Sequence, residues 1–445
     1  MHYDLTDKVY EEISKLPLYD VHTHMDSRHL SARGLHDVLL YHMVISDLYS
    51  SGCPDGARLS EMPDRTEVES RIERALPYLG NIQNTNSFWG VRLILKDLYG
   101  WDKPITADNW REVDALISEK SGDSAFERGI LKKAGIQRSC TELWRRFDGS
   151  GDDVLQYSLE WAFFARTQYG RHDTALIELE YSWNMETPGP PLPVTADLAS
   201  MHFAKKIRSV ADVKAAMKHF IDTIPKEDVI NAASHISTDI HYRPVSETEM
   251  EQAILRRDHA GAVEQEIYAN YINAMYIDMM TRQRPDILLQ FSIGAEPLPY
   301  ETGSKLHTHT MYELVDIFRK YPDRKFVFHV ASLHQNQAFS TIAKELPNVY
   351  LAGYWWHCFY PYAISSLFEQ RLEMLPMNKQ FIFFSDAYCA DWAYAKSVIV
   401  KKQIAQVMAG KIQQGQFTLD QVLDMLGRMF AEIPEKELGM IKGDF

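Results

Sequence analysis

Two histidines separated by one residue, His22 and His24, directly follow an apolar segment that begins at Leu16. Side chains two residues apart share one face of an extended strand, so both imidazoles can reach one point in space. Imidazole is a good ligand for zinc, nickel or iron, and a third ligand, usually a carboxylate, completes such a site. The spacing predicts part of a metal centre, with two unrelated surface histidines as the plain alternative.

A carboxylate that can complete this site lies near the other end of the chain. The apolar run 380–384 is followed by Ser385 and Asp386 and then by a long helical pattern. Catalytic groups of α/β barrels lie at the carboxyl ends of the strands. Asp386 would therefore face His22 and His24 across the mouth of a barrel; the alternative is that it caps the following helix.

The elements that must position these groups alternate between short apolar runs and longer helical patterns. Between residues 30 and 133 the pattern is mostly helical, which indicates an insertion after the first strand. Eight runs with helices between them predict one α/β domain over residues 1–445, a (β/α)8 barrel of the TIM type. The expected strands are 18–22, 136–141, 176–179, 229–236, 287–293, 325–330, 349–352 and 380–384.

Composition limits the classes of partner. Of the 445 residues, 45% are hydrophobic, enough for a large core. The formal net charge of -14 argues against nucleic acid, which requires clustered Lys and Arg, but one basic pocket would still bind an anionic small molecule. The sequence shows no membrane-spanning stretch, no signal peptide and no CxxC spacing among its four cysteines. We therefore expect a cytoplasmic protein with free thiols and no membrane partner.

Seven separated segments form a pattern that extends along most of the chain. They are the His22/His24 pair, Asn86-Ser87-Phe88-Trp89, the run 131–136 leading to Cys140-Thr141, Ala233-Ser234-His235, the run 289–295, the pair Trp355-Trp356, and Ser385-Asp386. In this order they resemble the uronate isomerases, a branch of the amidohydrolase superfamily of metal-dependent barrels. The resemblance implies that His22, His24 and Asp386 hold one divalent metal ion, zinc first, with manganese, iron or nickel as alternatives.

One histidine after the first strand also follows from the resemblance. The family's active-site histidine lies about ten residues before a glycine, which selects His42, counted back from Gly52, with His36 as a weaker candidate. Met43 stands where the family has a tyrosine, so a phenolic acid or base is missing there.

The positions that bind substrate depart further from the family. Tyr388 stands where the family has an arginine, Ser292 where it has a histidine, and its Phe-Arg-Pro-Asp segment has no counterpart near residues 177–183. A uronate carries a carboxylate that arginine binds bidentately, so two such contacts are missing. Arg243 is a candidate replacement, with an ordinary surface arginine as the alternative, and Tyr388 becomes a candidate acid or base.

Further candidates border the expected pocket. His329 ends the strand 325–330, where hydrolytic amidohydrolases commonly have a histidine; a buried structural histidine is the alternative. Trp355 and Trp356 are expected to contact the substrate, because an indole face stacks on the C–H surface of a sugar; core packing is the alternative. We expect His235 to contact the substrate too, whereas His307-Thr308-His309 opens a helical pattern and should not bind metal.

Three functional hypotheses follow. In the first, a sugar-acid isomerase interconverts an aldose such as D-glucuronate or D-galacturonate with its ketose, using Asp386 with His42 or Tyr388 for proton transfer. In the second, a mononuclear metal-dependent hydrolase attacks a lactone, ester or amide of a sugar-like acid, with Asp386 as base and His329 assisting. In the third, the protein binds metal without catalysis. The resemblance favours the isomerase. A homo-oligomer is compatible with the sequence.

Overall fold

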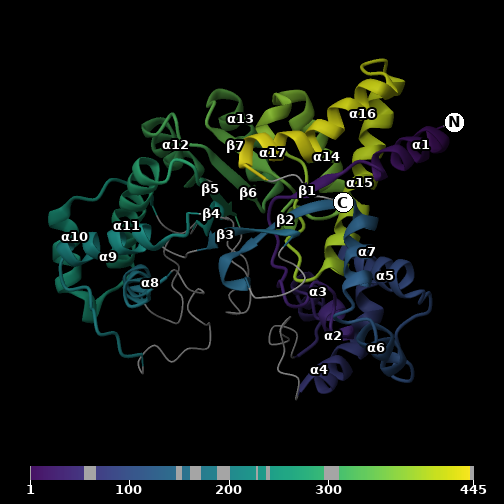
Figure 1. Cartoon of the computed structure of the whole chain (residues 1–445), viewed down its shortest axis with the longest axis horizontal. Helices are drawn as coiled ribbons and strands as arrows, with labels where there is room; N and C mark the ends of the chain where they lie inside the picture. Colours follow the sequence, from purple (N-terminus) through teal and green to yellow (C-terminus); the bar gives the residue numbers. More distant parts are fainter. Residues whose placement is uncertain are drawn as a thin grey trace.

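A parallel sheet of eight strands forms the centre of the fold in the computed structural model (Figure 1). The structure describes residues 2–54, 67–146, 153–160, 172–187, 201–226, 229–236, 241–294 and 310–440. Each strand pairs with the next one in the chain, which confirms the predicted α/β barrel. The strands are β1 (Leu18–Asp20), β2 (Ile136–Glu142), β3 (Leu155–Glu160), β4 (Val229–His235), β5 (Leu288–Ile293), β6 (Phe326–Val330), β7 (Val349–Ala352) and β8 (Gln380–Phe381).

The third strand is not where the sequence predicted it. Residues 176–179 belong to the helix α8 (Thr174–Trp183), and the strand β3 is formed by Leu155–Glu160. A short apolar run fits a buried helix as well as a buried strand, so the run 176–179 could not decide between them. The true strand alternates apolar and polar residues at 155–159, but both kinds are buried because neighbouring strands and helices cover them.

Main-chain hydrogen bonds close the barrel just beyond the first and last strands. The N–H of Asp386 donates to the carbonyl of His22 (3.0 Å), and the N–H of His24 donates to the carbonyl of Ala387 (2.8 Å). The segments after β1 and β8 therefore lie side by side, at the carboxyl ends of their strands. This junction is where the sequence placed the metal ligands.

A helical insertion separates β1 from β2, as predicted. Its helices lie together beside the barrel in Figure 1. Asp123 begins the last of them by accepting hydrogen bonds from the N–H groups of Ala125 and Phe126, and Gly135 ends it with φ 81°, a conformation that favours glycine. The inserted helices are α2 (Leu35–Leu39), α3 (His42–Ser50), α4 (Val68–Ala75), α5 (Asn86–Tyr99), α6 (Trp110–Ser118) and α7 (Ser124–Ala134).

The remaining helices pack around the sheet and on one another. The buried helix α15 packs against α1, α5, α7 and α14. No helix in the described part of the chain is both long and apolar enough to cross a bilayer. These helices are α1 (His2–Ser14), α9 (Val210–Thr223), α10 (Glu247–Leu255), α11 (Ala262–Gln283), α12 (Thr310–Lys320), α13 (Leu333–Glu345), α14 (Pro361–Met374), α15 (Ala390–Gln413), α16 (Leu419–Gly427) and α17 (Ile433–Leu438).

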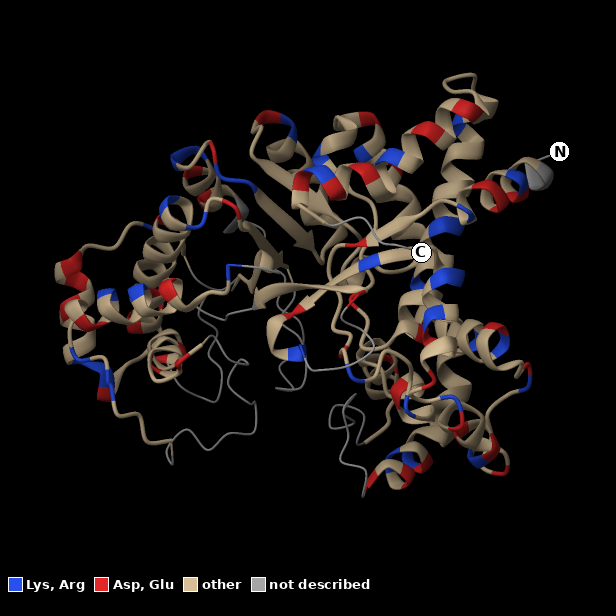
Figure 2. Ribbon diagram, viewed as in Figure 1, with Lys and Arg blue, Asp and Glu red and all other residues tan. Residues whose placement is uncertain are grey.

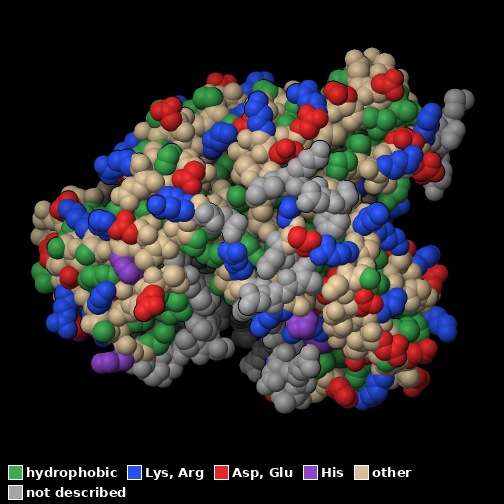
Figure 3. All heavy atoms as spheres, in the orientation of Figure 1, with side chains coloured by type: hydrophobic (Ala, Val, Ile, Leu, Met, Phe, Trp, Pro, Cys, Tyr) green, Lys and Arg blue, Asp and Glu red, His purple; other side chains and the backbone are tan. Residues whose placement is uncertain are grey.

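Charged side chains of both signs are interspersed along the outer helices (Figure 2). On the face drawn in Figure 3, lysines and arginines alternate with acidic side chains and do not form one broad basic patch.

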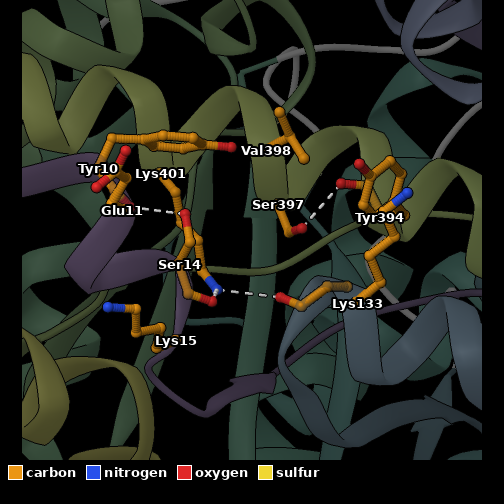
Figure 4. Close-up of a pocket in the computed structure, with 10 residues that line it drawn as sticks. Tyr10, Glu11, Ser14, Lys15, Lys133, Tyr394, Ser397, Val398 and Lys401 are labelled. Carbon is orange, nitrogen blue, oxygen red and sulfur yellow. Dashed lines mark hydrogen bonds between the residues drawn. The ribbon is translucent and has the colours of Figure 1, made fainter. Parts of the chain in front are cut away.

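A cavity of about 420 Å³ lies between the ends of α1 and α7 and the helix α15, and Lys401 from α15 lines it (Figure 4). The Lys401 ammonium donates to the carbonyls of Ala134 (3.1 Å), Leu16 (3.4 Å) and Ser14 (3.4 Å). It therefore ties α15 to the ends of α7 and α1. Burial lowers the pKa of Lys401 to about 8.

This buried ammonium should make stability depend on pH. Between pH 8 and 10.5 the unfolded chain holds a proton on Lys401 that the folded chain has released, so stability increases as pH rises through this window. Relative to Lys401→Met, we expect the wild type to gain on the order of 3 kcal/mol between pH 7 and pH 10.5. Urea unfolding across this range measures the gain, and exposed Lys402→Met is the control. If the free energy of unfolding differs between wild type and Lys401→Met by the same amount at every pH, the expected role of Lys401 is contradicted.

Candidate metal centre

The two histidines predicted as ligands project from the segment that follows β1. The N–H of Thr23 donates to the carbonyl of Cys140 (2.8 Å), and its hydroxyl donates to the carbonyl of Ala387 (2.9 Å). Thr23 is thus tied into the barrel wall, and the side chains on either side of it, His22 and His24, both reach Asp386. Their ring centroids lie 5.0 Å apart.

Asp386 is held by its own main chain. Its φ of 52° lies in the left-handed region, which aspartate tolerates better than most residues. Its N–H donates to the carbonyl of His22, and its carbonyl accepts a hydrogen bond from the hydroxyl of Tyr41 (2.5 Å). These hydrogen bonds hold the main chain of Asp386 at the junction between the segments after β1 and β8.

Three potential ligand atoms converge on one point. Asp386 Oδ1 lies 3.2 Å from His24 Nε2 and 3.7 Å from His22 Nε2, and the ligand atoms of the three residues all lie within 4.8 Å of one another. His22 and Asp386 are each 5% exposed. Two imidazoles and a carboxylate at this spacing form a donor set that suits a divalent transition metal.

The electrostatics also favour a cation at this point. Burial, and then the neighbouring His24, lower the pKa of His22 to about 4, which keeps its imidazole neutral. Burial raises the pKa of Asp386, but hydrogen bonds from His24 and His42 outweigh burial and hold that pKa well below its usual range. Burial lowers the pKa of His24, but Glu142 and Asp386 raise it well above its usual value. The surroundings thus stabilise positive charge, which a divalent ion would supply.

Glu142 and Arg145, two further members of this cluster, were not identified from the sequence. Glu142, the last residue of β2, binds Nδ1 of His24 with one carboxylate oxygen. Its other oxygen accepts hydrogen bonds from Nε of Arg145 (2.7 Å) and the hydroxyl of Thr141 (3.2 Å). A carboxylate on one ring nitrogen directs the other toward a metal. The sequence did contain a signal for Glu142, because this carboxylate lies at the end of a strand, as Asp386 does.

Replacing Glu142 should weaken metal binding without removing a ligand. In Glu142→Gln the charge that holds His24 is lost, and we expect a 10- to 100-fold lower affinity for zinc. Competition with a chromogenic chelator measures this affinity. Glu313→Gln is the matched control, because Glu313 binds Nδ1 of His241 (2.9 Å) at the surface. Equal affinities in wild type and Glu142→Gln would show that Glu142 does not position His24.

His42 and Trp356 meet on the other side of Asp386. His42, the first residue of α3, places Nε2 3.5 Å from Asp386 Oδ2, the oxygen that does not face His24. Trp356 stacks on the His42 ring with centroids 4.8 Å apart and planes 14° from parallel. The φ angle of Trp356, 49°, is unusual for a bulky residue, and such strained conformations concentrate at functional sites.

His329 lies next to the three ligands but is already engaged. Its ring centroid is 4.9 Å from that of His22, and the side chain is fully buried. The amide nitrogen of Gln290 is 2.5 Å from its Nε2, so this ring nitrogen accepts; Nδ1 lies 3.5 Å from the hydroxyl of Ser292. Burial, and then His22, lower the pKa of His329 well below its usual value. This environment is that of a neutral imidazole beside the centre.

The remaining predicted residues divide between the centre and the surface. The Tyr388 ring stacks on His24 with centroids 4.8 Å apart. Trp355 is buried, and its ring lies 5.4 Å from that of His235, which ends β4. Arg243, in contrast, forms ion pairs at the surface with Glu249 (3.2 Å) and Glu266 (3.2 Å), as expected for an ordinary surface arginine. The pair His307 and His309 lies outside the described residues.

No protein-family model and no curated protein matches this sequence. Solved structures do match. Uronate isomerase from Thermotoga maritima superposes with a TM-score of 0.75 at 11% identity over 98% of this chain and 97% of its own. Glucuronate isomerase from Caulobacter crescentus superposes with a TM-score of 0.73 at 13% identity, over 100% of this chain and 95% of its own. A protein from Lactobacillus casei assigned as a metal-dependent hydrolase gives 0.59 at 13% identity over 97% of each chain. At this level of identity the likeness shows that the fold is shared.

Proposed function

We propose that this protein is a metal-dependent isomerase that interconverts the aldose and ketose forms of a sugar acid such as D-glucuronate or D-galacturonate. The observation that carries the proposal is the convergence of His22, His24 and Asp386 at the carboxyl ends of the strands, with His42 on the second oxygen of Asp386. The fold around this group is the one found in two isomerases of uronates over nearly the whole chain.

The residues of the centre divide the chemistry between them. His22, His24 and Asp386 would hold one divalent ion, zinc first among the candidates, which when bound polarises the carbonyl and hydroxyl oxygens of a sugar. His42 Nε2 is the proposed base that removes the proton from the carbon next to the carbonyl, and Asp386 Oδ2 can exchange a hydroxyl proton with it at 3.5 Å. The Trp356 ring keeps the His42 imidazole in one plane.

Tyr388, Trp355 and His235 complete the proposed pocket. Tyr388 lies against His24 and is the second candidate to hold a proton during the reaction. The indole of Trp355 lies between the rings of Trp356 and His235, so this row of rings offers apolar faces to the C–H surface of a sugar.

Arg145 is a buried cation next to this pocket, and we propose that it makes the carboxylate contact for which the sequence offered Arg243 as a candidate. Its guanidinium lies 5.1 Å from the ring centroid of Tyr388, and its side chain is 5% exposed. Arg145→Met should raise KM for D-glucuronate about 10- to 100-fold, the usual cost of a hydrogen bond to a charged group. Arg243→Met at the surface is the matched control.

The corresponding aldose without a carboxylate separates binding from positioning. If Arg145 acts only through Glu142 and His24, the variant lowers kcat for the acid and the neutral sugar equally. A KM change restricted to the acid supports the carboxylate contact, and equal changes for both sugars would overturn it.

A hydrolase acting on a lactone, ester or amide of a sugar acid is the second candidate. It is favoured by His329, whose neutral imidazole lies beside His22. A panel of D-glucuronate, D-galacturonate and D-glucuronolactone, analysed by product, separates the two reactions. Ketose formed from the free acids supports the isomerase, whereas lactone opening without ketose supports the hydrolase.

We also propose a reducing, cytoplasmic environment. All four cysteines are free and buried, and burial raises the pKa of Cys140 and Cys389 above their usual values. Such thiols stay protonated and unreactive.

A further inference from the structure

A second cavity, of about 360 Å³, lies far from the metal centre in the fold. It is lined by residues of α11, α12 and the loop that precedes α10, whereas the centre is built on β1, β2 and the segment after β8 (Figure 1). Its walls are mainly apolar and include Tyr242, Ile277, Ile317 and Tyr321. A volume of this size accommodates a small organic ligand.

One side chain in the wall is an amide without a partner. Asn273, in the middle of α11, is 3% exposed, and neither Nδ2 nor Oδ1 makes a hydrogen bond in the described part of the structure. Asn270, one turn earlier, shows the usual arrangement: its Nδ2 donates to the carbonyl of His241 (2.7 Å) and its Oδ1 accepts from the N–H of Arg243 (3.1 Å). Asn273 therefore differs from its neighbour in carrying an unused donor and an unused acceptor.

The hydroxyl of Tyr321 in the same cavity is also buried without a partner among the described residues. Buried polar groups are nearly always paired, and leaving one unpaired destabilises the fold. Asparagine also weakens the interior of a helix, so Asn273 offers no local advantage. Apolar walls with a few unpaired polar groups are the composition of a ligand site.

Two of the charged side chains that line the cavity, Glu313 and Arg243, are engaged with other residues, and Asp316 and Lys320 also line it. Glu313 accepts from Nδ1 of His241 (2.9 Å) and from the N–H of Tyr242 (2.7 Å), and Arg243 is paired with two glutamates. A charged ligand that bound at Glu313 or Arg243 would have to displace one of these partners, whereas a neutral ligand would not. The two polar side chains that lack a partner among the described residues, Asn273 and Tyr321, are themselves neutral.

We propose that this cavity binds a small, neutral cyclic amide, a compound that presents an N–H and a carbonyl on the same edge of an apolar ring system. The N–H would donate to Oδ1 of Asn273, and the carbonyl would accept from Nδ2, so both unused groups are satisfied together. The hydroxyl of Tyr321 supplies an additional hydrogen bond, and the apolar walls cover the rings.

The probe for the test is quinolin-2(1H)-one, with 1-methylquinolin-2(1H)-one as the matched compound that lacks the donor. Ligand-observed NMR titration and thermal shift of the full-length protein measure binding. For the wild type we expect saturable binding of the probe with Kd on the order of 10⁻⁴ to 10⁻³ M, and at least about tenfold weaker binding of the methyl compound.

Two variants place the ligand in this cavity. Asn273→Leu should lose at least about tenfold in affinity for the probe while its Tm without ligand stays at or above that of the wild type, because an unpaired amide has been removed. Tyr321→Phe keeps the ring and should weaken the probe about threefold or more, and it decides the matter if Asn273→Leu does not fold.

Three results would overturn the proposal. They are no saturable binding of the probe to the wild type, equal affinity for the methylated compound, and unchanged affinity in the variants. A cavity that holds only water would give no saturable binding. Binding of the probe elsewhere on the protein would leave its affinity unchanged in the variants.

Discussion

Asp386→Ala protein should bind no divalent metal at the centre and should lose turnover by about 10⁴-fold or more. Asp386 Oδ1 faces both His22 and His24, at 3.7 and 3.2 Å, and two imidazoles alone hold a divalent ion weakly. The same substitution removes Oδ2, the proposed proton partner of His42, so binding and chemistry are lost together.

Metal content after dialysis, measured by mass spectrometry, and kcat for D-glucuronate check this expectation. His22→Ala should behave in the same way. Asp286→Ala is the control, because Asp286 is an exposed carboxylate paired with Arg284. Full activity of Asp386→Ala protein in the presence of a chelator would exclude catalysis at this centre.

His42→Gln should retain the metal and lose kcat by about 10²- to 10⁴-fold, the usual contribution of a positioned acid or base. His42 is outside the group of three ligands, and its Nε2 faces the far oxygen of Asp386. Glutamine keeps a polar side chain of similar reach but cannot exchange a proton at neutral pH.

His36→Gln is the matched control for this variant. His36 is also buried and also faces a carboxylate, with Nε2 3.4 Å from Asp37 Oδ1, but that pair lies within α2. Metal loss in His42→Gln would make His42 a ligand, and unchanged kcat with metal bound would exclude it as the base.

The candidate centre could be predicted from sequence because its three candidate ligands follow recognisable strands. His22, His24 and Asp386 each come after an apolar run, and parallel strands in a barrel bring their carboxyl ends to one face. By the same rule Glu142, which follows the expected strand 136–141, was also a candidate, but its contact with His24, 118 residues away, appears only in the folded chain.

The errors of sequence reasoning also have physical causes. The sequence predicts a strand at 176–179, but a run of four residues is too short to distinguish a strand from a buried helix. Packing in the folded chain selects the helix. The sequence left Arg243 open between a carboxylate contact and an ordinary surface arginine, because ion pairs such as those with Glu249 and Glu266 appear only in the folded chain. Arg145 was overlooked because its burial against Tyr388 appears only in the folded chain.

The most direct test of the proposed chemistry is NMR of the zinc- or manganese-loaded protein with D-glucuronate and D-galacturonate in D2O. We predict that the ketose forms and that deuterium appears at the carbon next to the carbonyl, since His42 and Asp386 exchange the abstracted proton with solvent. If protein that holds one metal ion per chain forms no ketose and shows no deuterium exchange, the isomerase assignment is contradicted.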